Sequence, residues 1–140
     1  MRSGVEVPTD LMMSSDQVRQ LRRAGMQIGA HTVSHPILAL LADHEARREI
    51  ADSKQELEAI VDAPVDLFAY PNGRPGVDFK PRDVEIVREL GFAAAVSTAW
   101  GAGARGFDLH QLPRFTPWDR GQWGFGLRLA RNLSGFARSQ

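Results

Sequence analysis

One local pattern occurs twice in the chain and limits the folds that it can adopt. Residues 13–25 and 81–91 each have the apolar spacing of an amphipathic helix, and each ends at a glycine. A short apolar segment follows each helix directly, at 26–31 and 92–98, and reads as a buried strand. Helices that alternate with apolar strands lacking a polar alternation favour a parallel sheet covered by helices, either an open sheet or a barrel.

The helix ends carry residues that favour helix termini. Ser14 and Gln17 fit a capping box at the first helix, and Pro81 suits the first position of the second. The remaining expected elements are a helix at 43–63, a strand at 65–70, a short strand at 110–117 and a last helix at 123–133.

The composition is that of one ordinary globular domain. The chain has 140 residues, of which 43% are hydrophobic and 24% charged. Its 17 basic and 17 acidic residues cancel, so we expect no nucleic-acid or acidic-membrane partner. No apolar run is long enough to span a membrane, and the absence of cysteine excludes disulfides and thiolate metal sites. The first residues lack the apolar core of a signal peptide, and the compartment stays open.

Two histidines, His31 and His35, stand four apart in the segment HTVSHP. Neutral imidazole is the commonest metal-binding side chain, and two residues within a single turn can face one ion. Pro36 disfavours helical backbone at His35, and Thr32 rather than a glutamate follows His31. The pair is therefore expected at a strand end plus a tight turn. On spacing alone, chance or a core role is the favoured interpretation.

The strand expected at 65–70 runs into a loop of proline, asparagine and glycine that contains Asn72. In parallel sheets covered by helices, chemistry gathers where strands end and loops begin. His31 and Asn72 both fall at expected strand ends. We therefore expect the two residues to share one face.

With these residues placed, the chain resembles the polysaccharide deacetylases, the family of the NodB homology domain of carbohydrate esterases. The family motif His-(Ser/Thr)-x-x-His-Pro is matched at every specified position by HTVSHP. The setting matches too: a capped helix ending in Ala-Gly, a strand ending in Gly-x-His and, after the next helix, a strand ending in a Pro- and Gly-containing motif, here FAYPNG. The similarity runs from about residue 13 to residue 115.

The resemblance implies a distorted (β/α) barrel that hydrolyses N-acetyl or O-acetyl groups on polysaccharides such as chitin, peptidoglycan and poly-N-acetylglucosamine. In the family, two histidines and one aspartate hold a divalent metal, often zinc. Carried over by position, His31 and His35 are the expected metal ligands. The metal would polarise the acetyl carbonyl and lower the pKa of a bound water.

The resemblance also implies further site residues. Asn72 matches the residue whose backbone N–H helps to hold the oxyanion. Arg114 is the candidate to replace an arginine that many members carry where this chain has Ala69. His110 matches the family's late histidine by order, with a surface loop role as the alternative. Tyr70 and Pro71 are the expected substrate contacts.

Tryptophan supplies a further set of aromatic candidates. Trp100, Trp118 and Trp123 could stack on sugar rings or pack, and packing is the expectation for Trp123.

The family's first motif, Thr-Phe-Asp-Asp-Gly, is the main departure. It supplies both the third metal ligand and the catalytic base, yet the chain contains no Asp-Asp pair and only thirty residues precede His31. We therefore expect residues 1–140 to be a partial deacetylase domain that lacks the first strand or strands and could bind an N-terminal complement. Asp16 or Asp119 would be the base if the short chain were active.

Two classes of function remain. One is a metal-dependent polysaccharide deacetylase, acting on an N-acetylglucosamine-containing polymer, whose full catalytic set needs the absent segment. The other is a non-catalytic remnant that binds carbohydrate or a partner protein through an exposed apolar surface where absent strands would have packed.

Overall fold

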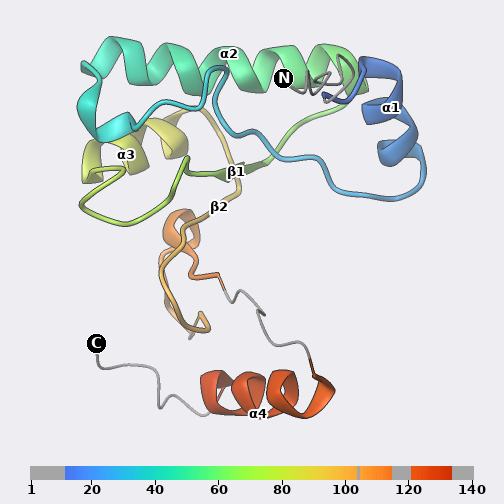
Figure 1. Cartoon of the computed structure of the whole chain (residues 1–140). Helices are drawn as coiled ribbons and strands as arrows, with labels where there is room; N and C mark the ends of the chain where they lie inside the picture. Colours follow the sequence, from blue (N-terminus) through green and yellow to red (C-terminus); the bar gives the residue numbers. More distant parts are fainter. Residues whose placement is uncertain (1–11, 104, 115–120, 134–140) are drawn as a thin grey trace, which may run out of the picture.

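The computed structural model describes residues 12–103, 105–114 and 121–133. The protein is α/β, as predicted, with four helices, a small parallel sheet and two short 3₁₀ turns within these ranges (Figure 1). No helix in the described part of the chain is long and apolar enough to cross a membrane. The elements in chain order are α1 (Ser15–Arg23), η1 (Leu38–Leu40), α2 (Asp43–Val61), β1 (Leu67–Ala69), α3 (Pro81–Glu89), β2 (Ala94–Val96), η2 (Leu109–Gln111) and α4 (Gln122–Leu133).

The sheet is built from segments that neighbour one another in chain order. β1 and β2 pair in parallel, with Phe68 opposite Ala95. Single parallel bridges extend the pair on both sides, from Ala30 to Phe68 and from Leu112 to Val96. Parallel neighbours in chain order, joined by helices, are the arrangement of part of a (β/α) barrel.

The strands expected at 26–31 and 110–117 are therefore shorter than predicted, since each contributes only a single bridge to the described structure. Within the described residues each segment pairs on one side only, so few backbone hydrogen bonds hold it in a strand conformation. Residues 115–117 lie outside the described ranges.

The two faces of the sheet differ in burial. Phe68 and Ala95 are buried beneath the helices, whereas their strand neighbours are only half-buried, namely Leu67, Ala69, Ala94 and Val96. Burial thus alternates along each strand, although the apolar sequences hide this alternation because both faces carry apolar residues. In a closed barrel the second set of side chains would point inward. The open second face matches a partial barrel.

The core lies between the sheet and helices α2 and α3 (Figure 1). Ile50 from α2 and Val87 from α3 are fully buried there with Phe68. Tyr70 stacks on Phe79 with ring centroids 3.8 Å apart and planes 9° from parallel. Because these residues come from successive elements, the core fixes the positions of the loops that follow the strands.

Local signals set the helix ends, largely as predicted. The Ser14 N–H donates to Gln17 Oε1 at 2.8 Å and the Gln17 N–H donates to Ser14 Oγ at 3.3 Å, which completes the expected capping box. Pro81 is the first residue of α3, and Gly91 follows that helix with φ +77°. α2 ends two residues before the expected end because Asp62 adopts a left-handed conformation, φ +51°.

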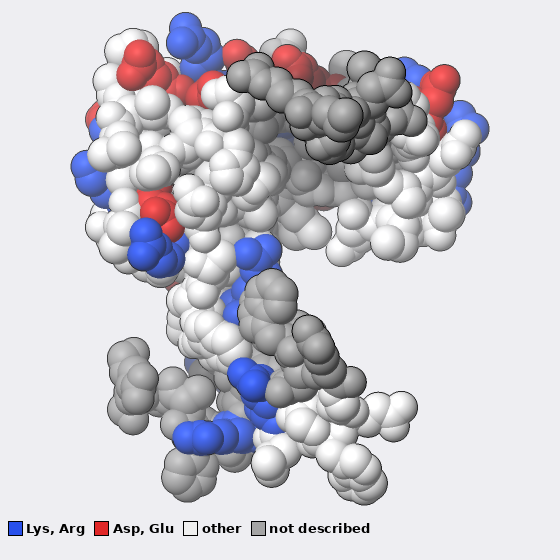
Figure 2. Space-filling model, viewed as in Figure 1, with Lys and Arg blue, Asp and Glu red and all other residues white. Residues whose placement is uncertain are grey.

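α4 forms where a last helix was expected and lies apart from helices α1–α3 (Figure 1). Figure 2 shows basic side chains in this part of the molecule. The α4 sequence contains Arg128 and Arg131. The expected packing of Trp123 is wrong for the described structure, since this side chain is 94% exposed. Trp100 is also exposed and lies 5.8 Å from the Arg128 guanidinium. Trp118 lies outside the described residues.

We expect Ile50→Ala to lower the free energy of unfolding by about 2–5 kcal/mol, because it removes a fully buried side chain and leaves a cavity under the sheet. Leu40→Ala is the control, since Leu40 is 79% exposed and should change stability by no more than about 0.5 kcal/mol. Urea denaturation of both variants measures the effect. Equal effects of the two changes would contradict the assigned core.

Candidate metal and active site

Predicted site residues from two segments lie at the carboxyl edge of the sheet. His31 follows the bridge at Ala30, and Asn72 lies three residues after the end of β1. Two backbone hydrogen bonds fix the register of the first pair: Ala30 N–H donates to Leu67 O at 2.8 Å, and Ala69 N–H donates to Ala30 O at 2.9 Å. His31 is thereby held beside the end of β1.

The imidazole of His31 has a defined orientation. Its Nδ1 lies 2.7 Å from the carbonyl oxygen of Ala69. A carbonyl oxygen can only accept a hydrogen bond, so Nδ1 carries the proton and the neutral ring has its lone pair on Nε2. Metal-bound histidines usually donate their other ring N–H to such a carbonyl or carboxylate. His31 is exposed, and its chemistry fits a metal ligand through Nε2.

His35 lies next to His31. The two ring centroids are 4.9 Å apart with planes at 70°, and both residues are exposed. The structure therefore brings together the two histidines of the HTVSHP segment, at an open surface where two imidazoles could face one ion. The donor set of this pair fits a zinc-type metal, which commonly takes imidazole nitrogen.

The turn that joins the two histidines has an unfavourable backbone. Thr32 has φ +62° and His35 has φ +58°, and both are non-glycine residues in the left-handed region. This costs roughly 1–2 kcal/mol per residue, and a β-branched residue such as threonine is rare there. The Thr32 hydroxyl donates to His31 O and accepts from the His35 N–H at 3.2 Å.

Glu49 of α2 also contacts this turn, although no local sequence pattern indicates it. Its Oε2 accepts the N–H groups of Val33 and Ser34, each at 2.9 Å, and its Oε1 accepts the Ser34 hydroxyl at 2.7 Å. Burial raises the pKa of Glu49, but these hydrogen bonds and nearby Arg48 outweigh burial and hold the pKa below its usual value. Glu49 lies on the charged face of its helix, which by sequence alone reads as solvated surface.

The loop after β1 is held against the segment after β2. The Thr98 hydroxyl donates to Asn72 O at 2.9 Å, and the Thr98 N–H donates to Gly73 O at 2.8 Å. Gly73 has φ +80°, and an added Cβ would lie 3.0 Å from the Thr98 nitrogen, so only glycine fits. Asn72 is exposed with φ +56°, and none of the described residues accepts its backbone N–H.

Tyr70 and Pro71, expected as substrate contacts, are both buried. The Tyr70 ring belongs to the core, and its hydroxyl donates to His110 O at 2.9 Å. Burial raises the pKa of this hydroxyl well above its usual value. These buried side chains pack beneath the surface at the start of the Asn72 loop, and we do not propose that they touch substrate.

The structure separates the two late candidates, His110 and Arg114. His110 Nε2 is 2.8 Å from the carbonyl of Phe92, which precedes β2, and its Nδ1 is 3.6 Å from Asp108 Oδ1. Its ring therefore lies at the amino edge of the sheet, opposite the His31 edge. The Arg114 N–H donates to Ala99 O, beyond the carboxyl end of β2, so Arg114 lies toward the His31 edge and is exposed.

The described residues contain no group of three or more His, Cys, Asp or Glu side chains that could hold a metal. His31 and His35 are thus a pair without a third such ligand in those ranges. Asp16, considered as a replacement base, lies on α1 and forms an ion pair with Arg19 at 2.7 Å. Asp119 lies outside the described residues.

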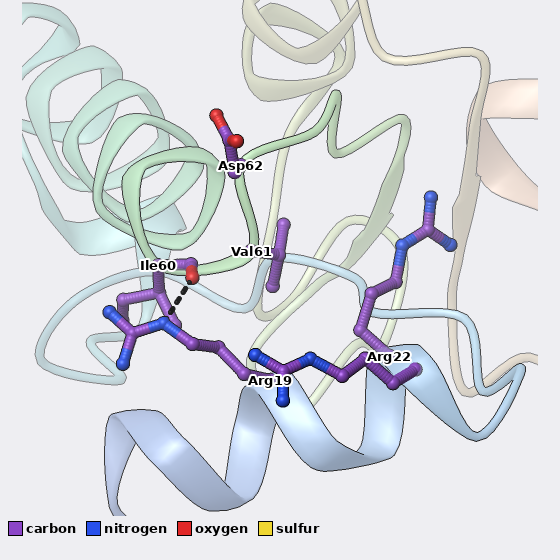
Figure 3. Close-up of a pocket in the computed structure, with 6 residues that line it drawn as sticks. Arg19, Arg22, Ile60, Val61 and Asp62 are labelled. Carbon is purple, nitrogen blue, oxygen red and sulfur yellow. Dashed lines mark hydrogen bonds between the residues drawn. The ribbon is translucent and has the colours of Figure 1, made fainter.

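A groove of about 370 Å³ lies at a different place, between α1 and the end of α2 (Figure 3). The Arg19 Nε–H donates to the Ile60 carbonyl across it at 2.9 Å. The groove contains neither of the paired histidines nor the Asn72 loop. Its lining residues are Arg19, Arg22, Arg23, Ile60, Val61 and Asp62.

Comparison with known sequences identifies the family. The sequence model described as polysaccharide deacetylase matches residues 6–95. The Bacillus subtilis protein YxkH, whose name places it among the polysaccharide deacetylases, is 24% identical over 102 residues, which are 73% of this chain and 35% of YxkH. The chain belongs to the polysaccharide deacetylase family, a family of hydrolases that generally depend on a metal.

Solved structures support the fold. The deacetylase PplD of Streptococcus pyogenes, solved in complex with acetate, matches with a TM-score of 0.77 and 23% identity over 86% of this chain and 51% of its own. IcaB from Ammonifex degensii matches with a TM-score of 0.67 and 19% identity over 91% of this chain and 54% of its own. The chain therefore spans about half the length of these structures and about a third of YxkH.

We expect the neutral ring of His31 to carry its proton on Nδ1, because the Ala69 carbonyl accepts from that nitrogen. Long-range proton–nitrogen NMR spectra at alkaline pH distinguish the two tautomers, and His31→Gln identifies the His31 signals by their loss. His44, exposed on α2, provides an internal reference for a surface histidine. A dominant Nε2–H tautomer of His31 would contradict the assigned ligand atom.

Proposed function

We propose that this chain is part of a metal-dependent hydrolase that removes acetyl groups from a polysaccharide containing N-acetylglucosamine. The observation that carries the proposal is the histidine pair, in which two exposed imidazoles lie 4.9 Å apart and one is oriented by a backbone carbonyl. This pair stands in a chain of the polysaccharide deacetylase family.

His31 and His35 would hold the metal, with zinc as the metal of choice for imidazole ligands. When bound, such a metal polarises the acetyl carbonyl and lowers the pKa of a bound water. The third ligand of the family is an aspartate, and we propose that a Thr-Phe-Asp-Asp-Gly segment, which these 140 residues do not contain, supplies it together with the catalytic base.

Asn72 and Arg114 would act on the substrate and on the base. The Asn72 N–H would donate to the oxyanion, since it lies on a loop fixed to Thr98 and no described residue accepts it. The Arg114 guanidinium would orient the carboxylate of the base through two parallel hydrogen bonds. His110 has no role in this proposal, because its ring binds the opposite edge of the sheet.

A second function is favoured by one specific observation. The open face of the sheet leaves Leu67, Ala69, Ala94 and Val96 half-buried, and apolar faces of this kind bind partners. The chain could therefore act as a non-catalytic unit that binds carbohydrate or a partner protein, including an N-terminal complement of its own domain.

Zinc titration and acetate release test the first function. The 140-residue chain alone should bind zinc weakly and release little acetate from chitin oligosaccharides, because a catalytic zinc normally has three protein ligands. A version extended by a Thr-Phe-Asp-Asp-Gly segment should bind more tightly. It should also react about 10²–10⁴-fold faster, the usual contribution of a positioned base.

His31→Ala in the extended version should abolish both gains, and His44→Ala is the matched control that should retain them. Full activity of the short chain would mean that the base is misassigned and that Asp16 or Asp119 serves instead. No acetate release by the extended version, together with tight binding of chitin oligosaccharides by the 140-residue chain, would favour the second function.

A further inference from the structure

We propose that Glu49 is a positioning residue that holds His31 and His35 in their metal-binding arrangement before the metal arrives. The inference rests on the proposed function, because it assigns a role toward the same histidine pair. It adds a residue from α2 that lies outside the HTVSHP segment.

The hydrogen bonds that Glu49 makes to described residues fall between the two histidines. Oε2 accepts the N–H groups of Val33 and Ser34, and Oε1 accepts the Ser34 hydroxyl. Three hydrogen bonds to two consecutive residues fix both the position and the tilt of the turn. The directions in which the His31 and His35 side chains leave the backbone are set by that turn.

The turn needs such a support because its own backbone is unfavourable. Thr32 and His35 both have positive φ, a conformation that persists only where surrounding structure over-determines it. The Thr32 hydroxyl bridges the two ends of the turn, but both of its hydrogen bonds are made within the turn. Among the described residues, Glu49 supplies the hydrogen bonds that tie the turn to another element.

Glu49 is also well anchored. It precedes Ile50, which is fully buried, and it lies one turn after Ala46, which is buried as well. The carboxylate therefore projects from a part of α2 that the core immobilises. A charged acceptor also makes stronger hydrogen bonds to N–H donors than a neutral one. The turn is thus tied to the core through one side chain.

Three variants separate positioning from other roles. Glu49→Ala removes all three hydrogen bonds. Glu49→Gln keeps an amide oxygen that can accept both backbone N–H groups, while its amide nitrogen can donate to the Ser34 hydroxyl. Glu56→Ala is the matched control, because it makes the same change at an exposed position of the same helix.

Zinc is the probe, and its binding to the full chain is followed on the imidazole NMR signals, a method suited to weak affinity. Glu49→Ala should weaken zinc binding about 10–100-fold, the usual cost of losing a residue that orients metal ligands. Glu49→Gln and Glu56→Ala should stay within about threefold of the unmodified chain. Equal losses in Glu49→Gln and Glu49→Ala would mean that charge acts on the metal, and would overturn positioning.

Amide hydrogen exchange without metal gives an independent readout. In Glu49→Ala the N–H groups of Val33 and Ser34 should exchange faster, while the Ala69 N–H, bonded to Ala30 O, should not change. Unchanged exchange at the two turn amides would overturn the inference. Equal zinc affinity of Glu49→Ala and the unmodified chain would also overturn the inference, while leaving the proposed function intact. An unmodified chain that binds no zinc would instead refute the metal site itself.

Discussion

The site depends on one short backbone pairing, between Ala30 and β1. Two hydrogen bonds, from Ala30 N–H to Leu67 O and from Ala69 N–H to Ala30 O, set the register of this pairing. Because Ala30 is bonded to Ala69, the next residue, His31, meets the Ala69 carbonyl with its Nδ1. A shift of one residue would turn the His31 side chain to the other face of the sheet. Register therefore decides which imidazole nitrogen of His31 is hydrogen-bonded and which keeps its lone pair.

Helices were predictable from sequence because their determinants are local. The Ser14–Gln17 capping box and the glycine after α3 act within one helical turn of the residues that they terminate. The strands were less predictable. The strand expected at 26–31 depends on a partner, Phe68, some 38 residues away and forms only a single bridge in the described structure. Apolar residues on both faces also hid the alternation of burial in β1 and β2. The family motif, in contrast, indicated the histidine pair from six consecutive residues.

The placement of four residues depends on tertiary contacts that no local pattern encodes. Tyr70 follows β1 directly, yet it packs into the core against Phe79 instead of facing the open edge. His110 and Arg114 are close in sequence but belong to opposite edges, because the segment between them runs parallel to β2 along its length. Glu49 was missed because its partners lie fifteen and sixteen residues earlier, across a turn.

Contacts among the described residues shape the histidine pair. Ala69 orients the His31 ring, Thr32 bridges the turn, and Glu49 ties the turn to α2. None of these contacts requires a third ligand, so the two imidazoles are organised independently of the rest of a metal site. Organisation in advance lowers the entropy lost on binding, and a further carboxylate would then meet a pair already in place. Under the proposed function, metal binding by the pair and catalysis by the complete site would therefore be separable properties.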